Sequence, residues 1–516
     1  MSRTENVAKN MLWKMVGLGC TAVLNFANRY VFMHWLGPEY LGVSGLFGSV
    51  FGVLALADLG LNSAFAFCFY QAIANEDQQH CAFLTHYLKK KLNLISAVML
   101  FAGLLITPFI PALVTGNEMI SDKALRLYYV LFLFDLIIPY TFMARLCYIT
   151  ARQQEYVVEP IMVLSGIIKV VVGMVCVCTT RNYVVFLLSG IIIHFAQYLF
   201  LNRYAVRRFP ELSLAPEGAL KETEKKTIVR NVKAIVVAKI ATVSIYQTDN
   251  ILTSIGIGIV TTGFVSNYVS IKNMITSLIS HFTGCLTPSM GNVIVTESEE
   301  KQLNIFYQYL ALNTFLVCGC FVGLTTLASP FIALLFGQEA VLSQEIVFFF
   351  HLPMVFAFSF YALEVLPTAH GRRNIGISMV WVETIANLII SVVAMKQWGL
   401  IGIYIGTLVA QLLVYFIKPF IIMSKLYNDK PWKFFCITGR GIVVALIIWL
   451  IIKTISRFLF RSIETWGEWM LLAVLTAGIY FVGYSILHWR NPEYKNVLHK
   501  MVNYTTNIFV RIKSKS

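Results

Sequence analysis

The sequence predicts an all-α polytopic membrane protein with about fourteen transmembrane helices, and two observations carry that prediction. Hydrophobic residues make up 58% of the 516 positions and charged residues only 13%, whereas a soluble domain carries about 25% charged residues. The apolar residues also gather into fourteen runs separated by polar breaks. Each run is long enough to cross a bilayer as a helix, which takes about 20 residues.

The fourteen predicted spans follow one another along the whole chain and are joined by polar loops. They cover residues 11–36, 43–69, 92–114, 125–146, 156–178, 182–202, 234–256, 260–286, 304–328, 345–368, 375–395, 399–424, 436–456 and 467–488. Because the number of spans is even, both termini are expected on the same side of the membrane.

Lys and Arg are distributed unequally between the two sets of loops. If the termini are cytoplasmic, the inner loops and tails hold 26 of these residues and the outer loops hold 5. Basic residues are retained on the cytoplasmic side, so this orientation is predicted. The net charge of +15 then reflects inner loops that lie against an anionic leaflet. We therefore expect membrane lipids, and no nucleic acid, as partners of these charges.

The longest internal polar break divides the chain into two predicted lobes. It is a basic, cytoplasmic linker at residues 203–233, with six spans before it and eight after it. The predicted organisation is an N-terminal lobe at 1–202, a C-terminal lobe at 234–424, two appended spans at 425–488 and a basic cytoplasmic tail at 489–516.

Polar residues within span 1 predict a functional face. Asn25, Asn28 and Arg29 are spaced i, i+3 and i+4, so they share one side of a helix. A guanidinium at this depth costs at least about 2.5 kcal/mol against lipid and normally faces a partner helix or a wet cavity. We interpret the face as the lining of a path. The alternatives are a polar seam between helices and an arginine that reaches the interface.

Spans 7 and 8 carry a second set of polar residues at similar depth. Asp249 and Asn250 lie in span 7, and Asn267 and Lys272 lie in span 8. Lys272 and Arg29 are predicted to form a cationic site, with Asp249 as the partner of one of them when the site is empty. The alternative is a structural Lys272–Asp249 pair between neighbouring helices.

Carboxylates within spans are candidates for carrying a proton: Asp58, Asp135 and Glu364 are the candidates for ion coupling, and Glu383 is a further buried acid. Burial raises carboxyl pKa values, so each of them is able to carry a proton. Lys169 is a further charge within a span, whereas histidines such as His194 lack metal-ligand spacing and are interpreted as structural. The sequence predicts no catalytic residues, no metal site and no cofactor.

Three local predictions concern helix geometry. Segment 70–91 is expected to form a short amphipathic helix on the inner membrane face, with a solvated loop as the alternative. Glu364 precedes Pro367, which predicts a broken helix. Gly402 and Gly406 form a G-x-x-x-G pattern, which predicts close helix packing.

Three stretches resemble a known family. They are RYVFMHWLGPEYLGVSGLFGSVFGVLALADLGL at 29–61, TDNILTSIGIG at 248–258 and SNYVSIKNMITSLISHFTGCLTPSMGN at 266–292. These stretches, and the plan of spans over essentially the whole chain, resemble the flippases for O-antigen and capsule repeat units. Those flippases belong to the multidrug/oligosaccharidyl-lipid/polysaccharide exporter superfamily.

The resemblance implies two six-helix lobes around a central cavity, plus two extra C-terminal helices, working by alternating access. The implied substrate is an undecaprenyl-diphosphate-linked oligosaccharide, moved from the inner to the outer leaflet of the bacterial cell membrane. Related flippases line the cavity with cationic residues on spans 1 and 8, which here are Arg29 and Lys272. The acidic Asp249 departs from a purely cationic cavity. A polysaccharide polymerase and chain-length machinery are the implied protein partners.

Other functions are compatible with parts of the pattern. A drug or metabolite exporter of the same superfamily would share the architecture and use the buried carboxylates. A flippase for the peptidoglycan precursor would need nearly the same chemistry. An enzyme such as a polymerase or a glycosyltransferase would need a catalytic outer loop, and the predicted outer loops are too short to build one.

Overall fold

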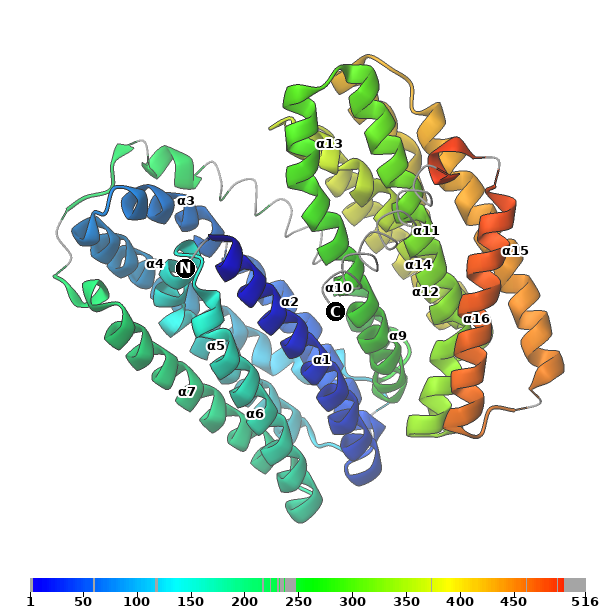
Figure 1. Ribbon diagram of the computed structural model, residues 1–516. Coiled ribbons are helices and arrows are strands. Elements are labelled where there is room, and N and C mark those ends of the chain that lie inside the picture. The colour runs from blue at the N-terminus through cyan, green and yellow to red at the C-terminus, as the bar shows by residue number, and fades with distance from the viewer. Residues whose placement is uncertain are drawn as a thin grey trace, which may run out of the picture. The chain divides into compact units, whose positions relative to one another are not determined.

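Helices make up every regular element in the described part of the chain (Figure 1). The computed structural model describes residues 3–58, 61–116, 119–215, 218–222, 224–229, 232, 236, 247–372, 374–460, 462–489 and 491–495. Within these ranges, the side chains at 3–16, 18, 57, 58, 62, 63, 67, 281, 282, 284–286 and 288 are outside the description. The predicted all-α class is confirmed.

The chain divides into two compact units, Met1–Ser266 and Asn267–Ser516. The division falls inside one long helix and later in the chain than the predicted linker at 203–233. The predicted lobes are defined by membrane spans and by the polar break between them, not by contacts between residues. They therefore stay a prediction.

The first unit contains the helices of the predicted spans 1–6 and the end of span 7. In chain order they are α1 (Arg3–Trp35), α2 (Pro38–Leu54), η1 (Ala55–Asp58), α3 (Leu61–Ala74), α4 (Gln78–Ile106), η2 (Thr107–Leu113), α5 (Asp122–Ala151), η3 (Glu155–Val157), α6 (Glu159–Thr180), α7 (Tyr183–Arg208), η4 (Pro210–Ser213) and α9 (Thr248–Gly256). Within this unit α1 packs on α6, α6 on α7, α7 on α5, and α5 on α4 (Figure 1). Most of predicted span 7 lies outside the described residues.

The second unit is organised around α11. Its elements are the larger part of α10 (Ile259–Thr296), α11 (Glu299–Phe336), η5 (Gln338–Ala340), α12 (Gln344–Leu363), α13 (Val365–Ala369), α14 (Ser378–Tyr427), α15 (Trp432–Leu459) and α16 (Trp466–Leu487). Helix α11 packs against α12, α15 and α16, and α12 packs against α14.

Within the described residues, nine helical segments are long and apolar enough to cross a membrane. They correspond to predicted spans 3–6 and 9–14, because the 50-residue α14 contains two predicted spans. Large apolar residues such as Phe101, Ile192 and Val474 are 66–70% exposed. Such faces are unfavourable in water and are expected where helices contact lipid.

Side-chain caps explain where several helices begin. Asp77 accepts a hydrogen bond from the amide of His80 at 2.9 Å, and this cap starts α4. Thr465 and Glu468 form a reciprocal capping box at the start of α16. These caps satisfy amide groups that have no partner within the helix.

Two predicted element boundaries are wrong. Span 2 was expected as one helix over 43–69, but the helix ends at Leu54, tightens into 3₁₀ geometry over Ala55–Asp58 and resumes as α3. Segment 70–91 is not a separate surface helix, because its larger part is the start of α4. Once Asp77 caps that helix, no proline interrupts it before Thr107, so it continues into the apolar run.

The turn inside α14 confirms the predicted close packing at Gly402 and Gly406. The backbone at Gly399 has φ 59° and ψ −134°, so the chain reverses there. A Cβ added at Gly402 would lie 2.1 Å from the carbonyl oxygen of Ala394, and one at Gly406 would lie 2.3 Å from Ser391 Oγ. The two halves of α14 therefore pack at backbone contact distance.

Gly399→Ala is expected to destabilise the protein by about 1–3 kcal/mol, because residues with a Cβ rarely adopt this backbone conformation. The measurement is the thermal midpoint in detergent. Gly439→Ala in α15, where an added Cβ meets nothing within 4 Å, is the control. Equal midpoints for the two variants would contradict the prediction.

Candidate functional site

Arg29 joins α1 to the start of α10 inside the first unit. Its Nη1 donates a hydrogen bond to Ser266 Oγ at 2.9 Å, and that hydroxyl donates to the carbonyl of Gly263 at 2.7 Å. The Arg29 side chain is only partly buried, whereas Ser266 is buried. The guanidinium therefore contacts a neighbouring helix, and Arg29 as a whole residue is partly buried.

The two asparagines of the same face differ in environment. Asn25 is exposed, and Asn28 is partly buried. The Oδ1 atom of Asn28 is buried, and the described residues offer it no hydrogen bond. The predicted face thus changes from exposed to partly buried over one helical turn.

Within the first unit, polar contacts hold helix α9 against α2 and η2. Asn250 is buried and donates from Nδ2 to Ser49 Oγ on α2 at 3.0 Å. Ser254 donates to the carbonyl of Leu113 at 2.7 Å. Asp249 is partly buried, and its carbonyl accepts from the Thr253 hydroxyl at 2.7 Å. In this structure Asn250 has a structural contact, which the sequence did not distinguish from a lining role.

Lys272 lies in the second unit and rests on α12. Its Nζ is 3.9 Å from the centroid of the Phe350 ring and 3.4 Å from the Phe350 carbonyl oxygen. Both contacts stabilise a cation. The neighbouring Asn267 is fully buried. Because Arg29 and Asp249 belong to the first unit, the predicted joint site with Lys272 stays a prediction.

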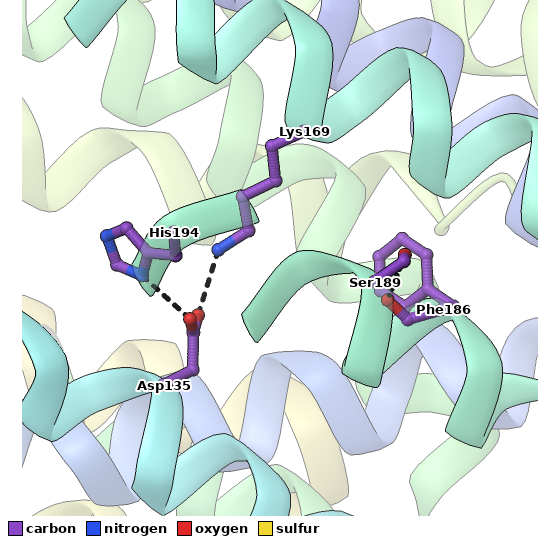
Figure 2. A network of polar contacts seen from close by, with 5 residues as sticks. All are labelled: Asp135, Lys169, Phe186, Ser189 and His194. Carbon is purple, nitrogen blue, oxygen red and sulfur yellow. Dashed lines mark hydrogen bonds and ion pairs between the residues drawn. The ribbon is translucent and has the colours of Figure 1, made fainter. Parts of the chain in front are cut away.

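Asp135 is the centre of a three-helix polar network (Figure 2). Its Oδ2 accepts from Lys169 Nζ on α6 at 2.9 Å, and its Oδ1 pairs with His194 Nδ1 on α7 at 2.7 Å. The carboxylate on α5 therefore has two basic partners from two other helices. The Asp135 side chain is 26% exposed, so the network is not sealed.

Sequence reasoning did not connect Lys169 and His194 with Asp135. The sequence did offer one signal, the position of each residue along its span. All three residues lie near the middle of their predicted spans, and these spans are consecutive in the chain. Spacing along the chain carries no such signal, since the residues are 34 and 59 positions from Asp135.

Glu364 lies where α12 ends and α13 begins, so the break predicted before Pro367 is confirmed. Its carboxylate pairs with the ammonium of Lys418, which is buried in α14. Glu383 is also buried nearby, and its Oε1 has no hydrogen bond among the described residues. The side chain of Asp58, the remaining coupling candidate, lies outside the described residues.

Comparisons by sequence identify no relative. No protein family matches the chain, and no curated protein matches it at a significant level.

Comparisons by structure find known transporters. The fold is similar to a solved structure of the lipid II flippase MurJ in an inward closed conformation, with a TM-score of 0.67 and 14% identity over 93% of this chain and 99% of that one. It is also similar to an inward-facing MATE multidrug transporter of the MOP superfamily, with a TM-score of 0.62 and 16% identity over 79% and 95%. A MOP-superfamily transporter from Pyrococcus furiosus gives a TM-score of 0.53 and 15% identity over 82% and 97%.

At these identities the likeness concerns the fold. The long apolar helices of the described residues and the similarity to these transporter structures support the same fold. The chain is a multi-pass membrane protein with the MurJ- and MATE-like transporter fold.

Proposed function

We propose that the protein is a flippase for a polyprenyl-diphosphate-linked oligosaccharide. It would move this lipid from the inner to the outer leaflet of the bacterial cell membrane by alternating access, for the assembly of a surface polysaccharide such as O-antigen or capsule. Both termini would be cytoplasmic, and the protein would not be an enzyme. The observation that carries the proposal is the cationic, partly buried Arg29 residue of α1, whose guanidinium donates to Ser266 on α10.

The chemistry of the substrate explains why an arginine is needed. A diphosphate cannot enter hydrocarbon unless cationic donors replace its water. A guanidinium offers planar, paired N–H groups that match phosphate oxygens. Asn25 and Asn28 on the same face would supply amide groups for sugar hydroxyls. In the second unit, Lys272 would supply a cation and Asn267 an amide group.

Arg29→Ala is expected to reduce export roughly 10- to 100-fold, because a hydrogen bond to a charged group contributes about 1.5–3 kcal/mol. The measurement is the amount of surface polysaccharide in a deletion strain that carries the variant, together with the protein level in the membrane. Arg29→Lys keeps the charge without the paired donors and should retain part of the export.

The matched control is Arg181→Ala. Arg181 is exposed at the end of α6 and lies on the ring of Trp35 at 4.8 Å, so it is a cation near α1 outside the proposed site. Export should remain normal in this variant. Normal polysaccharide in the Arg29→Ala strain would overturn the cationic-site proposal.

A flippase for the peptidoglycan precursor is the second candidate, and the likeness to MurJ over nearly the whole chain favours it. The distinguishing measurement is which lipid-linked sugar accumulates in the inner leaflet after deletion. Rescue of cells depleted of their lipid II flippase would select the second candidate. Drug resistance conferred on an efflux-deficient host, without lipid accumulation, would instead indicate a multidrug exporter.

A further inference from the structure

We propose that Asp135, Lys169 and His194 form a proton-binding site, and that a proton on His194 couples the transport cycle to the proton gradient. This triad rests on the proposed transport function and adds its driving ion. All three residues belong to the first unit and come from α5, α6 and α7.

The triad lies at mid-depth in its helices. Asp135 is near the middle of the 30-residue α5, Lys169 of the 22-residue α6 and His194 of the 26-residue α7. At about 1.5 Å per residue, each group is then roughly 15 Å or more from either end of its helix. Ionisable groups are expensive at this depth and mark ion or proton pathways in transporters.

The hydrogen-bond geometry selects the atom that takes the proton. An ionised Asp135 accepts from Lys169 and also from His194, so the neutral imidazole must carry its hydrogen on Nδ1. The lone pair is then on Nε2, which points away from Asp135 in Figure 2. A proton that binds there forms one N–H bond and breaks no contact of the triad.

Protonation changes the charge of the triad from zero to +1. The neutral state contains one carboxylate, one ammonium and one imidazole, whereas the protonated state contains two cations and one anion. An uncompensated charge at mid-membrane costs several kcal/mol. Proton binding therefore favours a conformation in which water reaches the triad, and proton release favours the arrangement in Figure 2.

No other described charge neutralises the triad. On α7, the ring of Tyr198 lies 5.1 Å from that of His194. On α5, Arg145 donates to Asn202, and on α1, which packs on α6, Arg29 donates to Ser266. The other elements packed on α5 add no charge at this depth: α3 and η2 have no charged residues, α4 has none from Leu92 to Ile106, and α2 has only Glu39 in its first turn.

Gly190 gives Lys169 the space to reach the carboxylate. It lies one turn before His194 on α7, and a Cβ added there would be 3.1 Å from Lys169 Cε. A larger side chain at this position must displace the lysine. Gly166 on α6 offers a matched control, because an added Cβ there meets nothing within 4 Å.

The test uses the full-length protein in proteoliposomes with a fluorescent undecaprenyl-diphosphate N-acetylglucosamine as the probe. A pH difference of one unit, equivalent to a tenfold proton ratio and about 1.4 kcal/mol, should accelerate flipping by the wild type several-fold. His194→Gln should flip the probe at one rate with and without the gradient. A sodium gradient at equal pH should have no effect.

A second readout does not depend on the lipid. In the purified protein labelled with ¹⁵N-histidine, the signal that disappears in His194→Gln should change when the pH is lowered, because a proton binds Nε2. Asp135→Asn and Gly190→Val should alter this change, and Gly166→Val should leave it as in the wild type.

The two readouts separate the possible failures. If the wild type responds to the gradient and His194→Gln responds equally, the triad is not the coupling site although the flippase function stands. If the His194 signal responds to pH but no probe is flipped, the proton site stands and the proposed function fails. An unchanged His194 signal across the whole pH range overturns the proton site.

Discussion

Gly42→Ala is expected to prevent stable folding of the first unit. A Cβ at Gly42 on α2 would lie 2.0 Å from the carbonyl oxygen of Ile259 on α10, and one at Gly263 would lie 2.3 Å from the Pro38 carbonyl oxygen. The two helices thus cross at backbone contact, and each glycine admits the other helix. Overpacking costs about 1–3 kcal/mol when side chains can yield, and here the obstacle is backbone. We expect a loss of at least about 3 kcal/mol.

The measurement is the yield of monodisperse protein in detergent and its thermal midpoint. Gly263→Ala should have the same effect, because it blocks the same crossing from the other helix. Gly48→Ala, also on α2 but with nothing within 4 Å of the added Cβ, should be tolerated. If Gly42→Ala and Gly48→Ala were equally stable, the close crossing of α2 and α10 would be wrong.

Glu364→Gln is expected to destabilise the second unit by about 3 kcal/mol, because it leaves the buried ammonium of Lys418 without its carboxylate. Lys418 is 3% exposed and its Nζ lies 5.1 Å from the centroid of the Phe360 ring, so little water reaches the ammonium. The double variant Glu364→Gln with Lys418→Met should recover most of the loss, since no charge then remains unpaired.

The control pair is Lys301 with Glu297, whose Nζ and Oε2 atoms are 2.8 Å apart and whose side chains are 58% and 33% exposed. Exposed ion pairs contribute about 0–1 kcal/mol, so Glu297→Gln should leave the thermal midpoint nearly unchanged. A similar change in the two single variants, or no recovery in the double variant, would show that the Glu364–Lys418 pair does not have the stability role inferred here.

Charged residues within the apolar runs were recognisable in the sequence, whereas the residues that contact them were not. Arg29, Lys272 and Asp135 were identified because a charge within an apolar run is expensive wherever it points. Ser266, Phe350 and His194, which contact them, carry ordinary side chains for a membrane helix. Their importance comes from pairwise distances between helices, and a single chain without relatives offers no signal for those distances.

Helix boundaries show the same division between local and long-range causes. Pro367 correctly indicated the helix break that precedes it. The start of α4 at Gln78 was missed, because the polar stretch before Leu92 looked like a surface segment by composition. Helical hydrogen bonds propagate through such a stretch once it is capped, so the helix extends beyond the apolar run.

By itself, the sequence determined that this protein is an all-helical membrane protein and that a few charges are placed within its spans. Both conclusions follow from transfer free energy, which depends on each residue's own chemistry and on its neighbours along the chain. Only the tertiary structure decided that Asp135 holds Lys169 and His194, that Arg29 bonds to Ser266, and that α2 crosses α10 at glycines. These contacts depend on how helices far apart in the chain approach one another, which is decided by close packing.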